Sequence, residues 1–154
     1  WSSDVCSSDL FGGSLSSGTF RTEIQGLIKA TKTSNNPADA LNTGRQVMAG
    51  SESALSCYIF GGQGSGVFLA SIEKFVISTE TTGTVSDTLT NDKNQCAAFR
   101  NNDYDIYLMG SNTSTETEIE KFNTSTDSIS TLSATVTSSS TLFWGGGLAG
   151  GGFA

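Results

Sequence analysis

Short apolar runs alternate along the chain with segments rich in serine, threonine and glycine. The run 55–60 contains aromatic and β-branched residues and ends on a pair of glycines, which is typical of a strand that enters a turn. In the segment 71–77 the apolar residues alternate, so that Ile72 falls on one side of an extended backbone and Phe75 on the other. We find no apolar stripe with the 3.6-residue period of a helix, so the pattern predicts an all-β fold.

The same pattern recurs along the chain. The phrase Ile-Glu-Lys-Phe occurs at 72–75 and again at 119–122, and a decayed copy stands at 24–27. Each copy follows an apolar run that ends in glycine, and the first glycines of these runs are separated by intervals of 49 residues. The markers of the repeat are Gly12, Gly13, Gly61, Gly62, Gly110, Ile72, Phe75, Ile119 and Phe122. A fixed period of about fifty residues predicts a repeat architecture.

Each full copy is expected to contain four strands. In the second copy these are 46–49, 55–60, 71–77 and 82–86, with a polar turn at 51–53. In the third copy they are 95–100, 104–109, 118–123 and 128–132. The first copy is worn, and its segment 32–39 is expected to be a loop where the outer strand would lie. The glycine-rich tail 144–152 aligns with the first strand of a fourth copy, and either a distorted strand or a flexible end fits it.

Composition excludes several kinds of function. The formal net charge of −7 argues against binding to nucleic acid or anionic membranes through a basic patch. The sequence lacks a run of apolar residues as long as a membrane-spanning helix, which needs about 18 or more. The chain contains no histidine, which removes the commonest general base and the commonest metal ligand. We therefore expect no catalytic residues, no metal site and no cofactor.

The first ten residues, WSSDVCSSDL, look like the translation of a sequencing-library adapter. We expect the segment 1–10 to be an artefact at the edge of an assembled read, as met in metagenomic data, and not part of the fold. The alternative is a genuine serine-rich N-terminus. Without this segment the chain keeps two cysteines, Cys57 and Cys96, neither of which lies in a Cys-x-x-Cys motif. A buried, small apolar role is expected for both, against the alternatives of a disulfide or a reactive thiol.

Two features superficially suggest a chemical site. The stretch 61–66 resembles a phosphate-binding loop, but it lacks the Gly-Lys-Ser/Thr ending and is better explained as the end of a strand. Carboxylate pairs such as Asp103/Asp105 and Glu116/Glu118 could act as acid–base partners or calcium ligands, but exposed turn residues are the simpler interpretation. The pairs Glu73-Lys74 and Glu120-Lys121 hold equivalent places in two copies, which indicates a structural role in the repeat.

An apolar strand that ends in glycines, followed by a strand with an aromatic residue and a Ser/Thr-rich turn, resembles the kelch repeat. The usual tyrosine of that family is replaced here by Phe75 and Phe122, and the later tryptophan by Thr82 and Ile129. The copies thus resemble a divergent branch, similar to kelch-like repeats of phage tail-fibre and other virion-associated proteins and of bacterial secreted proteins. The resemblance implies an open three-blade fragment of a β-propeller over residues 11–154, with four-stranded antiparallel blades and repeats at roughly 11–59, 60–108 and 109–154.

Function is then expected in the loops between strands, as is usual for propellers. These loops, 63–70, 87–94 and 111–117, offer amides, carboxylates and hydroxyls that could bind a glycan or a protein surface. The leading hypothesis is a non-catalytic structural or binding module of a phage tail or virion appendage. One alternative is a bacterial secreted or surface interaction protein, and another is part of an enzyme whose catalytic residues lie in missing blades. The expected setting is virion-associated or extracellular, and the missing blades of the same chain are expected partners.

Overall fold

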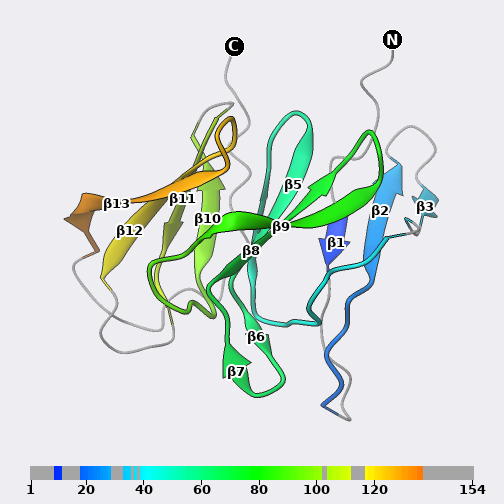
Figure 1. Ribbon diagram of the computed structural model, residues 1–154, viewed down its shortest axis with the longest axis horizontal. Coiled ribbons are helices and arrows are strands. Elements are labelled where there is room, and N and C mark those ends of the chain that lie inside the picture. Colours follow the sequence, from blue (N-terminus) through cyan, green and yellow to red (C-terminus); the bar gives the residue numbers. More distant parts are fainter. Residues whose placement is uncertain are drawn as a thin grey trace.

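The computed structural model describes residues 9–11, 18–28, 33–35, 37, 39–101, 104–111 and 117–136. Within these residues the fold is all-β: it consists of antiparallel strands and their connections, and it contains no helix. Three sheets stand side by side in chain order, and a small hairpin projects below the middle sheet (Figure 1). The all-β prediction is therefore confirmed.

The middle and third sheets each contain four strands. The middle sheet has the order β4 (Ala49–Glu52), β5 (Ser56–Phe60), β8 (Ser71–Val76) and β9 (Thr81–Thr88). The third sheet has the order β10 (Ala97–Arg100), β11 (Asp105–Met109), β12 (Glu118–Asn123) and β13 (Ser128–Thr135). These sheets span 49–88 and 97–135, so they cross the repeat boundaries expected near residues 59 and 108.

Some details differ from the predicted elements. The first strand of the middle sheet was expected at 46–49 but begins at Ala49, and Gln46 forms an isolated bridge with Gln63 instead. The strand continues to Glu52, so it includes part of the expected turn 51–53. The expected loop 63–70 contains a hairpin of β6 (Gln63–Gly64) and β7 (Val67–Phe68). The hairpin reverses at Ser65 and Gly66, which both have positive φ.

The first sheet has three strands: β1 (Asp9–Phe11), β2 (Ile24–Ile28) and β3 (Thr33–Asn35). The prediction that 32–39 lacks a strand is wrong for β3, because this short polar segment pairs along its whole length with β2. Asp9 and Leu10 of the adapter-like prefix pair with β2, so residue 10 does not coincide with a structural boundary. Residues 1–8 of the prefix and the tail 144–152 lie outside the described residues.

The strand register repeats in all three sheets. Phe11 pairs with Ile24, Phe60 with Ile72, and Met109 with Ile119. A backbone hydrogen bond recurs with the same interval: the amides of Leu41, Leu89 and Val136 donate to the carbonyls of Thr22, Ala70 and Thr117, at 2.8, 2.9 and 2.8 Å. The repeat is therefore a repeat of geometry as well as of sequence, and it includes the worn first copy.

Backbone conformations follow the same interval. Val47 and Gln95 hold equivalent places and have φ values of +48° and +55°. Glu80 and Asp127, in the turns that precede β9 and β13, both have a φ of +51°. Since non-glycine residues seldom adopt positive φ, their recurrence at equivalent positions shows that the loops repeat along with the strands.

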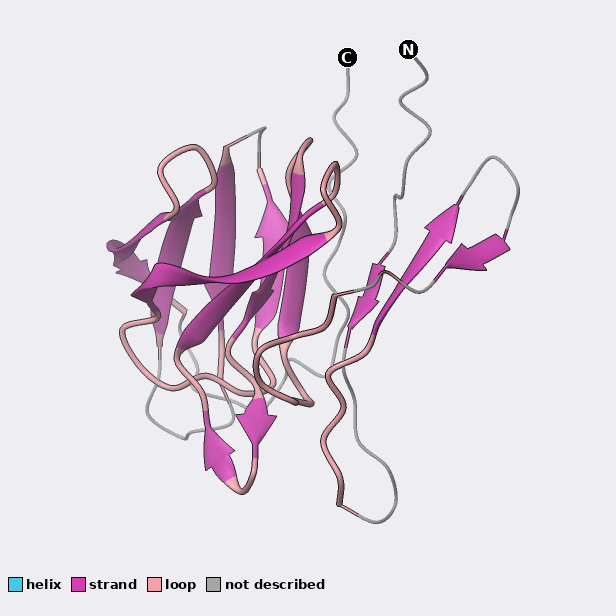
Figure 2. Cartoon of the chain, turned by 45° about the vertical axis from the view of Figure 1, so that its right-hand side comes forward, coloured by secondary structure: helices cyan, strands magenta, loops and turns pink. Residues whose placement is uncertain are grey.

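The core lies between the sheets. One cluster joins the middle and third sheets, with Phe60, Ile72, Ile106 and Phe122 each 0% exposed. At about 1.5–3 kcal/mol for each large apolar side chain that is fully buried, this contact is a main source of stability. A second cluster lies on the opposite face of the middle sheet and contains Ile24, Leu41, Cys57, Ile59 and Phe75. The middle sheet thus has an apolar cluster on each face, and in Figure 2 the first sheet stands at the right, beside the packed strands of the other two sheets.

Candidate binding hollow

A buried ion pair organises the candidate site. Glu73 lies on β8 and Arg45 in the segment that leads into β4, and their side chains are 1% and 0% exposed. The Arg45 guanidinium donates to the Glu73 carboxylate, to the carbonyl of Gly61 at 2.8 Å and to the hydroxyl of Ser71 at 3.1 Å. Burial lowers the pKa of Arg45 from its ordinary value, although the Glu73 carboxylate opposes this shift. Glu73 of the repeated Glu-Lys pair therefore has a structural role, as expected from its recurrence in the sequence.

Glu73 also fixes the loop that precedes β4. Its Oε2 accepts the backbone N–H of Asn42 at 2.7 Å, and its Oε1 accepts the backbone N–H of Thr43 at 3.2 Å. The side-chain amide of Asn42 donates to the hydroxyl of Thr84 at 3.0 Å. A carboxylate that accepts two backbone N–H groups satisfies donors that would otherwise be unpaired in a turn. The buried Glu73 carboxylate therefore fixes the backbone positions of Asn42 and Thr43.

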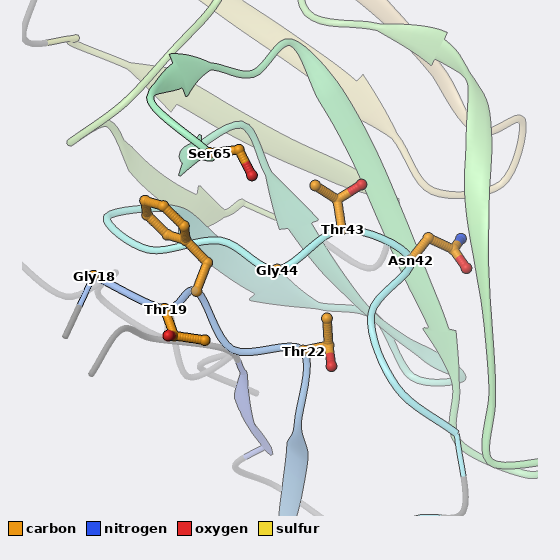
Figure 3. Close-up of a pocket in the computed structure, with 8 residues that line it drawn as sticks. Gly18, Thr19, Thr22, Asn42, Thr43, Gly44 and Ser65 are labelled. Atoms are coloured by element: carbon orange, nitrogen blue, oxygen red, sulfur yellow. The ribbon is translucent and has the colours of Figure 1, made fainter.

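The loop faces a hollow of about 490 Å³ at the junction of the first and middle sheets. The residues that line it are Gly18, Thr19, Phe20, Thr22, Asn42, Thr43, Gly44 and Ser65. In Figure 3, Thr43 and Ser65 stand on one side of the 42–44 segment, and Thr19 and Thr22 on the other. Segments from three separate parts of the chain thus meet in this hollow.

The junction depends on the close approach of two backbones. A Cβ at Gly44 would lie 2.8 Å from the carbonyl oxygen of Phe20, so a larger residue would push the walls apart. Two backbone hydrogen bonds join the segments 41–45 and 21–22: the amide of Leu41 donates to Thr22 O at 2.8 Å, and the amide of Arg45 donates to Arg21 O at 3.2 Å. The close contact at Gly44 and these hydrogen bonds therefore fix the distance between the two backbone segments that bound the hollow.

Among the described residues, the lining is uncharged and carries no ionisable side chain. It presents the hydroxyls of Thr19, Thr22, Thr43 and Ser65, together with a side-chain amide and the ring of Phe20. The hydroxyls of Thr43 and Ser65 have no hydrogen-bond partner within the described part of the chain. Such a site can exchange hydrogen bonds with a neutral polar ligand, and the described residues that line it include no general acid or base.

The arrangement beneath the hollow recurs one repeat later. Lys93 and Glu120 are both 0% exposed, and Lys93 Nζ lies 3.2 Å from Glu120 Oε2, which accepts no well-directed hydrogen bond. Glu120 Oε1 accepts the backbone N–H of Thr90 at 2.6 Å, as Glu73 does for the earlier loop. Lysine in place of arginine keeps the charge but loses the forked set of donors.

The marker residues of the repeat have structural positions. Gly61 follows β5 with a φ of +59°, and a Cβ there would lie 2.2 Å from the carbonyl oxygen of Lys93, so two backbone segments pass close together at this position. Gly62 and Gly110 also have positive φ. Ile72, Phe75 and Phe122 are buried in the two clusters and Ile119 is half-buried, whereas Gly12 and Gly13 lie outside the described residues.

Of the three loops expected to carry function, 63–70 is the only one whose described residues line the hollow, and it does so through Ser65. The walls at 18–22 and 42–44 were not anticipated from the sequence. A signal for the first existed: Gly18-Thr19-Phe20 matches Gly66-Val67-Phe68 at an interval of 48 residues, and Gly18 and Gly66 have φ values of +80° and +83°.

The other candidate features have ordinary structural roles. Asp105 accepts from the amide of Asn123 at 3.2 Å, and Glu118 accepts from the amide of Asn91 at 2.7 Å, while their expected partners Asp103 and Glu116 lie outside the described residues. Cys57 and Cys96 are buried and form no disulfide within the described residues, and burial raises the pKa of Cys96 to about 11. The stretch 61–66 leads into a β-hairpin.

Among the described residues, no group of histidine, cysteine and carboxylate side chains could hold a metal ion. Over the same residues, no helix has the length and apolarity needed to cross a membrane. Comparison with known proteins finds no family model and no curated protein that matches the chain.

Proposed function

We propose that the chain forms three blades of a divergent kelch-type β-propeller and serves as a non-catalytic binding module that contacts a neutral glycan at the hollow. The three sheets support the propeller proposal because they share one register and follow one another in chain order. The face of β8 that bears Ile72 packs against the third sheet, and the face that bears Phe75 packs toward the first. A succession of sheets that pack face to face is what the propeller proposal requires.

The observation that carries the binding proposal is the neutral, hydroxyl-rich lining of the hollow. Sugars offer many hydroxyls that both donate and accept, and the threonine and serine hydroxyls of the hollow match them in kind. The half-buried ring of Phe20 supplies an apolar surface for the C–H face of a sugar. A volume of about 490 Å³ lies within the range of about 300–1,000 Å³ that is usual for small-molecule sites.

A phage tail or another virion appendage is the proposed setting, since such structures contact glycans on host surfaces. The acidic net charge of −7 agrees with a role that does not depend on attraction to nucleic acid. The hollow needs no cofactor for this function, because hydrogen bonding and ring contacts are enough to hold a sugar.

Screening of the purified chain on an array of neutral and acidic oligosaccharides tests the proposal. A neutral oligosaccharide should bind, and Thr43→Val should weaken binding by about threefold to tenfold, as expected for loss of one hydrogen bond. The matched control is Thr79→Val, which changes an exposed threonine in the turn between β8 and β9 and should leave binding unchanged. Absence of any oligosaccharide signal, or equal weakening by both variants, would contradict the binding proposal.

A further inference from the structure

The junction between the middle and third sheets repeats the backbone contacts that bound the hollow. The amides of Leu89 and Lys93 donate to the carbonyls of Ala70 and Leu69, at 2.9 and 3.1 Å. These two hydrogen bonds are those between 41–45 and 21–22, with each donor and acceptor displaced by 48 positions in the sequence. In Figure 1 the β6–β7 hairpin and the connection from β9 to β10 lie at the same end of the middle sheet. We call the surface formed by 66–70 and 89–93 the second junction.

The loop of the second junction is also fixed by carboxylates beneath it. Glu120 Oε1 accepts the backbone N–H of Thr90 at 2.6 Å, which is the kind of contact that Glu73 makes at the hollow. The side-chain amide of Asn91 donates to Glu118 Oε2 at 2.7 Å. These contacts use the donors of the loop and leave the side-chain oxygen of Asn91 as an acceptor. The second junction therefore has a defined backbone frame before any ligand arrives.

The side chains on this frame differ from those of the hollow. Asp92 takes the position of Gly44, and Phe68 that of Phe20. Phe68 is 38% exposed, so more of its ring is open to solvent than is usual for a large apolar side chain in a folded chain. The Asp92 carboxylate is exposed and has no hydrogen-bond or ion-pair partner within the described part of the chain. The counterpart of Ser65 lies outside the described residues.

The exposed ring and the carboxylate belong to neighbouring backbone segments. Phe68 directly precedes Leu69, and Asp92 directly precedes Lys93, and these two following residues are hydrogen-bonded to each other through their backbones. The second junction thus offers an apolar ring, two carboxylate oxygens and an amide oxygen within one small area.

We infer that the second junction is a second site for a neutral sugar, in which Asp92 accepts two adjacent hydroxyls. The inference rests on the proposed function of the hollow, because the same backbone frame is assigned the same class of ligand. A carboxylate has two acceptor oxygens, and neighbouring hydroxyls of a sugar can donate one hydrogen bond to each. Hydrogen bonds to an ionised acceptor are stronger than those between neutral groups. The Phe68 ring supplies an apolar surface for the C–H face of the sugar.

Charge decides which glycans this site accepts. A sugar acid would place a second carboxylate close to Asp92, and the net charge of −7 adds to the repulsion. The second junction should therefore bind neutral sugars and reject acidic ones. The hollow, whose described lining is uncharged, does not make this distinction as strongly.

NMR titration of the isotope-labelled chain resolves the two sites, because each backbone amide reports on its own surroundings. The probes are the methyl glycosides of glucose, galactose and mannose, and the methyl glycoside of glucuronic acid is the acidic counterpart. A neutral glycoside should shift two groups of amide signals, one at 18–22 and 42–44 and one at 66–70 and 89–93. The glucuronide should leave the second group unshifted.

Variants assign the two groups to their sites. Asp92→Asn should weaken binding at the second group by about tenfold, as expected for loss of a hydrogen bond to a charged acceptor, and should leave the first group unchanged. Phe68→Ala should weaken the second group, and Thr43→Val only the first. The matched control is Glu80→Gln, which removes an exposed carboxylate from the turn between β8 and β9 and should change neither group.

The failure of this inference differs from the failure of the hollow. Shifts confined to 18–22 and 42–44 would leave the hollow as the sugar site and overturn the second site. Shifts confined to 66–70 and 89–93 would support the second site and contradict the hollow, and no shifts at all would overturn both. Equal effects of Asp92→Asn and Glu80→Gln on the second group would show that Asp92 does not contact the sugar. A second group that responds only to the methyl glycoside of glucosamine, and only at low salt, would indicate a cation site and would also overturn the inference.

Discussion

Replacement of Arg45 by methionine tests the central structural element of the hollow. Methionine keeps much of the length and apolar volume of the arginine stem but removes the guanidinium. Glu73 would then remain as a buried charge, 1% exposed, and its remaining hydrogen-bond donors among the described residues would be the backbone N–H groups of Asn42 and Thr43. The expected result is a large loss of folding free energy, together with a loosened wall of the hollow.

The magnitude follows from the burial of the pair. Removal of one partner from a buried ion pair typically costs about 3–5 kcal/mol, because the other charge is left uncompensated. We expect the loss of folding free energy in Arg45→Met to lie near the lower end of this range, since two backbone amides still stabilise the Glu73 carboxylate. Arg45→Lys should cost less, because Lys93 occupies the equivalent place beside Glu120 in the next repeat.

Equilibrium unfolding in urea measures these losses, and Lys74→Met is the matched control. The side chains of Lys74 and Asp127 are 27% and 34% exposed, so this pair is partly solvated. Partly exposed pairs are worth about 0–1 kcal/mol. If Arg45→Met costs no more than Lys74→Met, then the buried pair does not organise the loop, and the reasoning for the hollow is wrong.

Three further predictions concern stability and reactivity. The added Cβ of Gly66→Ala would have no atom within 4 Å, so this variant should lose about 1 kcal/mol of stability, from its positive φ alone. The added Cβ of Gly61→Ala would lie 2.2 Å from a carbonyl oxygen, so this variant should lose at least about 1–3 kcal/mol more, as is usual for overpacking. Equal losses for the two variants in thermal unfolding would contradict this prediction. Hydrogen bonds from the backbone and hydroxyl of Thr82 lower the pKa of Asp39 below 3.8, so its stabilisation is present above that value and lost as pH falls through the lowered pKa. The stability deficit of Asp39→Ala should therefore shrink on acidification, and a deficit that stays constant with pH would refute the assignment. Since burial raises the pKa of Cys96 to about 11, iodoacetamide at pH 8 should modify it only after unfolding, and rapid labelling of the folded chain would show that the thiol is accessible.

The sequence by itself determines the local structure of this protein. Period-two alternation, with Ile72 and Phe75 on opposite sides, predicts β8, and glycines at the ends of apolar runs predict where strands stop. These signals are local, because they depend on the geometry of a strand and on the conformations that glycine allows. The repeat interval then relates one sheet to the next, and the structure shows the same register in each.

The hollow could not be predicted in the same way. Glu73 looks like a polar residue on an alternating strand, and only the fold brings it to Arg45, which is 28 positions away in the sequence. Strand β3 is too short and polar to be recognised locally, and it exists because β2 offers it a partner. The walls of the hollow come from segments near residues 20, 43 and 65, which lie far apart in the sequence and meet only in the folded chain.

The physical reason for this division is the range of the forces involved. Alternation and turn preference act between neighbouring residues, so they can be recognised in a single sequence. A buried charge is tolerated only where a distant partner and several donors converge on it, and that convergence is a property of the packed sheets. The sequence thus decides that strands form and repeat, and the tertiary structure decides which polar groups are buried together and which remain open to a ligand.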